Sequence, residues 1–98
     1  MAIAVIQEFD GATVAQYDVA VDRMGIVSGG KHSDPGCLFH WVAATDEGLR
    51  IVDVWETREQ FDKFIDEQVV PNALEVGFPN PPRNTFYEVH AYFTQADG

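Results

Sequence analysis

The chain has 98 residues, which suffices for one domain with a hydrophobic core and leaves little room for a second. Its formal charge of −10 and its six scattered basic residues argue against nucleic-acid binding, which needs a basic stripe along the phosphates. The lone cysteine, Cys37, excludes a disulfide framework and a cysteine-based zinc site, and 46% apolar residues argue against wholesale disorder.

The N-terminal segment, residues 1–7, has no basic residue and no long apolar stretch. We therefore expect a strand at this position and not a secretory signal. No run of apolar residues approaches the length of a membrane-spanning helix. A cytoplasmic protein with no membrane partner is the expectation.

Strand and helix patterns alternate along the chain. A strand over residues 2–9 precedes a helix that begins at Thr13, where a Thr-x-x-Gln capping box is present, and ends near Gly25. The Gly-, Ser- and Asp-rich stretch 28–36 is typical of a loop, and its His32 is expected to be solvated.

The next pattern is that of a β-hairpin. Two runs rich in β-branched and aromatic residues, 38–45 and 49–56, flank an Asp-Glu-Gly turn. If residues 46 and 47 form the turn, His40 lies directly opposite Asp53 on one face of the sheet. A carboxylate that touches an imidazole fixes its tautomer, so this pair is either a structural tie or part of an acid/base site.

The C-terminal half repeats the helix-strand order. Thr57 opens a second amphipathic helix with another Thr-x-x-Gln pattern, and Pro71 is expected to end or kink it. A short helical turn over 72–76 and a Pro-rich linker follow, and a last strand is predicted over 85–94.

The order βαββαβ predicts the fold. Right-handed crossovers turn it into a four-stranded antiparallel sheet of order 4-1-3-2 with both helices on one face. We therefore expect a single α+β, ferredoxin-like domain over residues 1–98.

Alternation along the strands assigns side chains to two faces of this sheet. One face is almost wholly apolar, and the other places Leu38 beside His40 and mixes large apolar side chains with polar ones. If the strands align, the polar set is Gln7, His40, Asp53, Glu88 and His90. Helices can cover only one face, so we expect two copies to pack sheet against sheet as a homodimer.

Three stretches carry a resemblance to a known superfamily: the strand end Val52-Asp53-Val54-Trp55-Glu56, the helix with Phe61 and Phe64 directly after it, and the last strand Tyr87-Glu88-Val89-His90. With the βαββαβ order, they make nearly the whole chain similar to the dimeric α/β barrels, in particular the antibiotic biosynthesis monooxygenase-like group.

The resemblance implies a range of activities. Members include cofactor-independent oxygenases of polycyclic aromatics, haem-degrading enzymes, polyketide cyclases, isomerases and proteins without a known role. Their sites usually lie between the sheet and the helices of each subunit. The leading hypothesis is an enzyme that acts on an aromatic or polyketide-like small molecule without a tightly held cofactor, as a monooxygenase, cyclase or isomerase. A non-catalytic ligand-binding module and a haem-binding or haem-degrading protein are the alternatives.

The candidate catalytic residues are His40, Asp53 and His90. Asp53 would orient His40, and His40 would move a proton to or from the substrate, unless the two are simply a satisfied polar pair in an interface. His90 could be a second acid/base group or a haem ligand, or a core histidine bonded to the backbone or to Glu88.

The candidate substrate-binding residues are Tyr17, Trp55 and Tyr92. They could line an aromatic pocket, although aromatic residues at such spacings are also ordinary core, and the Tyr17 hydroxyl could simply reach the surface. No close ligand spacing such as H-x-x-x-H joins His40, Asp53, Glu88 and His90, so no metal site is predicted.

Overall fold

The computed structural model describes residues 1–26 and 33–95, so His32 lies outside the described residues. The elements are, in chain order, β1 (Ile3–Asp10), α1 (Val14–Arg23), β2 (Cys37–Ala44), β3 (Gly48–Trp55), α2 (Arg58–Phe64), the π-helix η2 (Ile65–Val69), α3 (Val70–Val76) and β4 (Arg83–Glu88).

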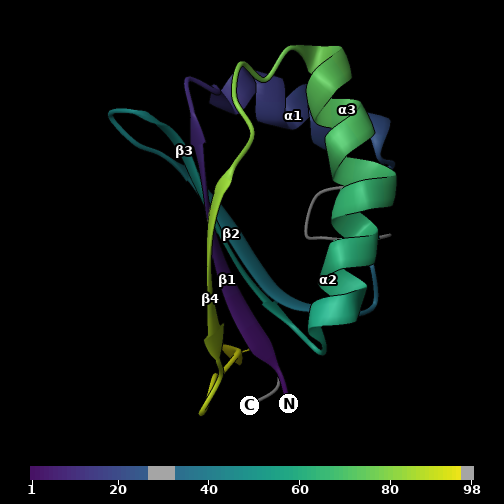
Figure 1. Cartoon of the computed structure of the whole chain (residues 1–98), viewed down its shortest axis with the longest axis vertical. Coiled ribbons are helices and arrows are strands. Elements are labelled where there is room, and N and C mark those ends of the chain that lie inside the picture. Colours follow the sequence, from purple (N-terminus) through teal and green to yellow (C-terminus); the bar gives the residue numbers. More distant parts are fainter. Residues whose placement is uncertain (27–32, 96–98) are drawn as a thin grey trace.

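The strands form one antiparallel sheet of order β2-β3-β1-β4. The helices α1, α2 and α3 lie on one side of it and leave the other side open (Figure 1). This arrangement confirms the predicted α+β, ferredoxin-like fold and its strand order. No helix in the described ranges has the length and apolar character that a membrane span requires.

The hairpin has the predicted register, and His40 pairs with Asp53. Backbone hydrogen bonds between Thr45 and Gly48 close the turn, the shorter one measuring 2.8 Å from the Thr45 nitrogen to the Gly48 oxygen. A Cβ atom at Gly48 would lie 2.1 Å from the carbonyl oxygen of Phe9, so only glycine fits where β1 passes the turn.

A β-bulge near the start of β2 changes which side chain faces the helices. Cys37 pairs with Trp55 and Phe39 with Val54, so Leu38 is the extra residue between two paired positions. The expected place of Leu38 beside His40 is therefore wrong, because the added residue shifts the alternation by one. Cys37 faces the helices instead.

Both predicted helix starts are capped by threonine. The Thr13 hydroxyl accepts the Gln16 N–H at 3.1 Å and the Gln16 side chain accepts the Thr13 N–H at 3.0 Å, which completes the capping box of α1. The Thr57 hydroxyl accepts the Gln60 N–H in the same way at the start of α2.

The second helical region is continuous but irregular. The π-helical turn η2 directly precedes α3, and Pro71 is the second residue of α3. Proline has no N–H to donate and its ring crowds the preceding turn, so the regular α-helical bonding cannot pass through it. The predicted distortion at Pro71 is therefore present, and Gly77, with φ of 87°, ends α3.

The last strand is shorter than predicted. It ends at Glu88, which pairs with Ile3, the first residue of β1. One further hydrogen bond joins the Val89 nitrogen to the Ala2 oxygen at 3.0 Å. Beyond this point β1 offers no partner, so the predicted extension to residue 94 is wrong, and His90 and Tyr92 lie outside the sheet.

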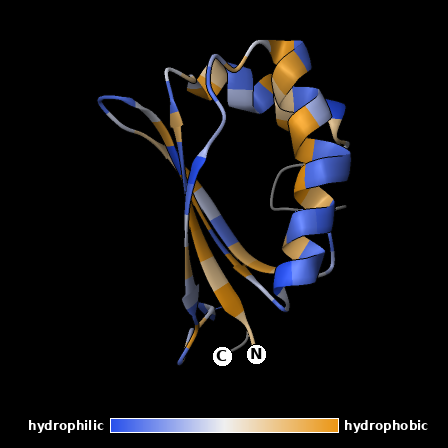
Figure 2. Ribbon diagram, viewed as in Figure 1, coloured by the Kyte–Doolittle hydropathy of each residue, from blue (hydrophilic) through white to orange (hydrophobic). Residues whose placement is uncertain are grey.

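The core lies between the sheet and the helices. One cluster centres on Val5, Trp55 and Phe61, with the Trp55 and Phe61 rings in edge-to-face contact at 5.8 Å. Figure 2 shows hydrophobic and hydrophilic residues alternating along α2 and α3, as expected for helices with one face on a core. A second cluster, built around Phe9 and Leu49, packs against Tyr17 of α1 and Val69 of η2 and borders the pocket.

Candidate functional site

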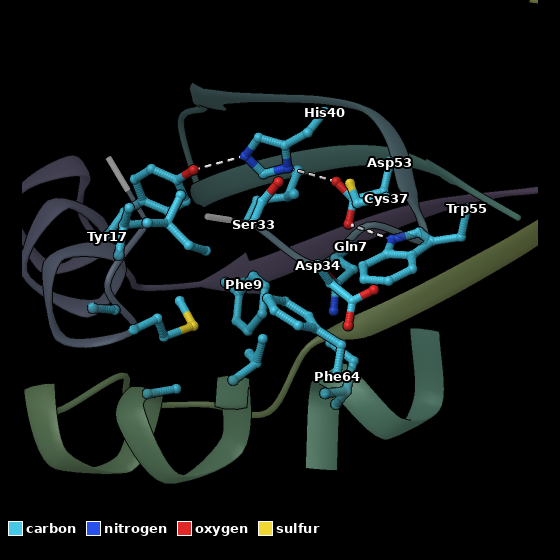
Figure 3. A pocket seen from close by; sticks show the side chains of 18 of the residues that line it. Gln7, Phe9, Tyr17, Ser33, Asp34, Cys37, His40, Asp53, Trp55 and Phe64 are labelled. Atoms are coloured by element: carbon cyan, nitrogen blue, oxygen red, sulfur yellow. Dashed lines mark hydrogen bonds and ion pairs between the residues drawn. The ribbon is translucent and has the colours of Figure 1, made fainter. Parts of the chain in front are cut away.

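A pocket with a cavity volume of about 90 Å³ lies between the sheet and the helices. Its walls are mainly apolar side chains from the strands β1 and β3 and from the helices, and Figure 3 shows the lining from close by. Few polar side chains interrupt these walls. They are Gln7, Tyr17, Ser33, Asp34, His40 and Asp53.

Four side chains form a continuous row of hydrogen bonds at this pocket (Figure 3). The Tyr17 hydroxyl lies 2.7 Å from His40 Nε2, and His40 Nδ1 lies 2.6 Å from Asp53 Oδ1. The indole N–H of Trp55 donates to the other Asp53 oxygen, Oδ2, at 3.1 Å. We call the row Tyr17–His40–Asp53–Trp55 the polar relay.

The carboxylate fixes the direction of the relay. An ionised carboxylate only accepts hydrogen bonds, so His40 Nδ1 must carry the hydrogen that points to Asp53. In the neutral imidazole, Nε2 is then the acceptor for the Tyr17 hydroxyl. The Tyr17 and His40 rings are inclined by only 13° at a centroid distance of 6.1 Å, which suits an in-plane O–H···N bond.

Ordinary secondary structure brings these groups together. Pairing in the hairpin places His40 opposite Asp53, and Trp55 lies two residues further along β3 on the same face. Tyr17 comes from α1, where its backbone N–H bonds to Thr13, so the capped first turn aims its ring at the sheet.

The relay runs from the interior to the rim of the pocket. The side chain of Asp53 is 8% exposed, whereas that of His40 is 38% exposed. Burial, and then the negative charge of Asp53, raise the pKa of Tyr17 to about 12. Tyr17 is therefore a protonated donor to His40 at neutral pH.

Cys37 lies in the same pocket but does not suit nucleophilic chemistry. Burial, followed by the charge of Asp53, raises its pKa to about 12. Its Sγ lies 3.6 Å from the carbonyl oxygen of Phe39 as a weak donor. The thiol remains protonated at neutral pH and contributes apolar lining.

The structure also identifies a residue to which the sequence assigned no role. Gln7 is 3% exposed, lines the pocket, and its Nε2 has no hydrogen-bond partner in the described structure. Strand alternation alone placed Gln7 on the face of His40, and its pairing with Ile51 confirms that placement. Its unpaired amide depends on the packing of α1 and α3 over the sheet and has no signal in the sequence.

The structure brings together four of the six predicted site residues: Tyr17, His40, Asp53 and Trp55. His90 and Tyr92 do not join them. Both lie beyond the end of β4, both are exposed, and neither lines the pocket. Among residues 1–26 and 33–95, no group of three or more His, Cys, Asp or Glu is arranged to hold a metal ion.

Comparison with known proteins gives a match in structure alone. No protein-family model matches the chain. No curated protein matches its sequence either.

The structural matches cover nearly the whole chain. Rv0793 from Mycobacterium tuberculosis superposes with a TM-score of 0.66 at 17% identity, covering 96% of this chain and 100% of that one. SnoaB, a cofactor-independent oxygenase from Streptomyces nogalater, gives 0.60 at 12% identity and covers 96% and 97%. A candidate antibiotic biosynthesis monooxygenase from Chloroflexus aurantiacus gives 0.58 at 23% identity and covers 95% and 98%.

Identities this low establish the fold, and the local chemistry has to be argued from the residues of this chain. The superpositions confirm the fold resemblance that the strand and helix patterns indicated. The chain has the fold of the antibiotic biosynthesis monooxygenase-like proteins.

Proposed function

We propose that this protein is an enzyme that binds a neutral aromatic small molecule and removes a proton from it, with His40 as the general base. The observation that carries the proposal is the polar relay, which opens onto an otherwise apolar pocket. A base held by a buried carboxylate, beside a cavity that excludes most water, is a common arrangement for proton transfer.

Tyr17 acts as the contact between substrate and base. Its hydroxyl donates its own hydrogen to His40 and still has lone pairs that can accept a hydrogen bond from a substrate hydroxyl. As the substrate gives its proton to the Tyr17 oxygen, Tyr17 passes its hydrogen to His40 Nε2. Asp53 stabilises the imidazolium that forms, and Trp55 holds the second carboxylate oxygen in place.

The reaction class depends on what the anion formed in this step reacts with next. An electron-rich phenolate or carbanion can react with molecular oxygen, so an oxygenase of this kind needs no tightly held cofactor. SnoaB, which shares the fold, is a cofactor-independent oxygenase. Cyclisation and isomerisation begin with the same proton removal, and we favour oxygenation because of that relative.

The pocket restricts the substrate by charge and size. Asp34 and Asp53 line it, and no Lys or Arg does so among the described residues, so carboxylate or phosphate ligands are disfavoured. Its volume of about 90 Å³ is below the ~150 Å³ of an engineered cavity that holds benzene. A single aromatic ring would therefore be only partly enclosed, with one edge at the open mouth of the pocket. Most of a fused polycycle would lie outside the pocket.

We also propose that the active form is a homodimer. The sheet face opposite the helices exposes Phe39, Trp41 and Tyr87 by 37%, 41% and 55%. These aromatic side chains share one face with the half-buried Ile6 and Val52 of the central strands. Large aromatic residues together on one face are typical of an interface, and a second copy would bury the same surface by two-fold symmetry.

Oxygen uptake with methylhydroquinone tests the function. We expect the protein to accelerate oxygen uptake, which ends either in one oxygen atom incorporated into the ring and the other reduced to water, or in the quinone and hydrogen peroxide; detection of an oxygenated product distinguishes the two. We expect His40→Gln and Tyr17→Phe to lower the rate of uptake by roughly 10²–10⁴-fold. His90→Gln is the matched control, because His90 is an exposed histidine away from the pocket, and it should retain full activity.

Two results would contradict the proposal. Equal rates in the wild type and in His40→Gln would remove His40 from the chemistry. Binding of aromatic ligands with no turnover of any of them would instead favour a non-catalytic ligand-binding module.

A further inference from the structure

Among the described residues that line the pocket, Gln7 is the one whose side chain has a polar atom that is both buried and unpaired. Its residue is 3% exposed, and Nε2 has no hydrogen-bond partner in the described structure. The amide faces the pocket from β1, the central strand beside β3 (Figure 3). A buried amide without a partner weakens folding, so its presence at the pocket floor calls for a partner that binds there.

The neighbours of Gln7 do not supply that partner in the described structure. Ile51, its register partner on β3, and Val5 and Phe9, which share its face along β1, are apolar and buried. On β4 its register partner is the exposed Asn84, and Gln7 Nε2 makes no hydrogen bond to it. Asp53, the nearest carboxylate in the register, already accepts hydrogen bonds with both oxygens.

We propose that Gln7 is the specificity-determining residue of the pocket, and that its Nε2 donates a hydrogen bond to an acceptor oxygen of the aromatic ligand. The inference deepens the proposed function, because it uses the same pocket and names the second polar anchor of the same ligand.

The sheet register sets where the two anchors lie. Ile51 is paired with Val42 of β2 on one side and with Gln7 of β1 on the other. His40 and the Tyr17 hydroxyl bonded to it approach from the β2 side. A ring that lies over Ile51 therefore has the relay at one edge and the Gln7 amide at the other.

This arrangement defines the ligand by its substituents. One edge of the ring carries a hydroxyl that can donate to Tyr17, and the other carries a carbonyl oxygen that can accept from Gln7. Asp34 and Asp53 disfavour a carboxylate in place of the carbonyl. The predicted class is a neutral hydroxyaryl ketone or a related aromatic with both groups.

Two nearly isosteric probes test the acceptor. In para-hydroxyacetophenone and para-isopropylphenol, a carbonyl oxygen and a methyl group occupy corresponding positions, and both phenols are mainly uncharged at neutral pH. Calorimetry should show that the wild type binds the ketone about tenfold more tightly, the value of one satisfied buried hydrogen bond.

Gln7→Met tests the residue, because methionine has a similar shape and no N–H. The variant should bind the ketone about tenfold more weakly and the alkylphenol as well as the wild type does. It should unfold at the same or a higher denaturant concentration, since it removes an unpaired buried amide. Ile51→Val is the control for a general change of the pocket, and it should keep the preference for the ketone.

Several outcomes would overturn the inference. For the wild type, these are equal affinity for the two probes, or no binding of the ketone at millimolar concentration. For Gln7→Met, they are a preference for the ketone that persists, or lower stability together with an equal loss of affinity for both probes. The proposed function is judged separately by oxygen uptake. If the protein prefers the ketone but turns over no substrate, the proposed catalytic activity is refuted and the role of Gln7 is not. If turnover depends on His40 but the protein does not prefer the ketone, only the proposed role of Gln7 is refuted.

Discussion

The two faces of the sheet differ in a way that is unusual for a small protein. The helix-covered face buries polar groups, with Gln7 at 3% and Asp53 at 6% exposure. The open face exposes aromatic ones, with Trp41 and Tyr87 at 41% and 55%. In an ordinary monomer the polar residues would face water and the aromatic residues would fill the core.

This difference between the two faces of the sheet has two separate explanations. Polar groups under the helices are costly, and they are retained where they serve a ligand or hold one another, as Asp53 holds His40 and Trp55. Aromatic groups on the open side are costly in water, and they are retained where a partner covers them. This difference is the basis for proposing a reaction at the helix-covered face and a dimer at the open face.

The largest effect is expected when a charge is placed on the open face. Trp41→Asp should convert the proposed dimer to a monomer, because a Trp buried in an interface contributes about 2 kcal/mol or more and a two-fold interface contains it twice. This sum of about 4 kcal/mol corresponds to roughly a thousandfold weaker dimer in sedimentation equilibrium.

Leu74→Asp is the control, because Leu74 is 73% exposed on α3 and away from the sheet. It should leave the mass unchanged. A wild type that sediments as a monomer at micromolar concentration would refute the assignment of the open face to assembly.

A smaller effect is expected from loss of the buried carboxylate. Asp53→Leu leaves the Trp55 N–H buried without its acceptor and His40 without its anchor, which should lower the free energy of unfolding by about 1–3 kcal/mol. Urea denaturation measures this cost. Asp62→Leu is the control, because it breaks only an exposed ion pair with Arg58 and should cost roughly 0.5 kcal/mol or less. Equal costs for the two variants would mean that the relay contributes nothing to folding.

The smallest effect is the alkaline titration of Tyr17. Its pKa is about 12 in the folded protein against a usual value of 10.0, so the stability that it contributes is fully present below pH 10 and is lost as the pH rises through about 12. The absorbance of ionised tyrosine, taken as wild type minus Tyr17→Phe, should rise near pH 12 in the folded protein. A rise near pH 10 would show that Tyr17 is neither buried nor held by the relay.

The hairpin was the most predictable part of the site. An Asp-Glu-Gly turn fixes the register of two short strands, and the register alone places His40 against Asp53. Trp55 follows from strand alternation. These relations are local, so a short stretch of sequence contains them.

Contacts between elements that are far apart in the sequence were harder to predict. The contact of Tyr17 with His40 depends on how α1 packs on the sheet. From the sequence alone, the Tyr17 hydroxyl could contact either a substrate or the solvent at the surface. The bulge at Leu38 and the early end of β4 depend on the partner strand, which a single strand pattern does not encode. His90 was misplaced in the sheet for that reason.

The chain contains two tryptophans, and the fold places one on each face: Trp55 is 1% exposed at the inner end of the polar relay, and Trp41 is 41% exposed on the open side. The intrinsic fluorescence of the protein therefore consists of two separable signals. Emission from Trp55 responds to whatever enters the pocket or alters Asp53, and emission from Trp41 responds to the polarity above the open face. Substituting either residue by phenylalanine leaves a single optical reporter, so ligand entry and assembly can each be followed in solution without an attached dye.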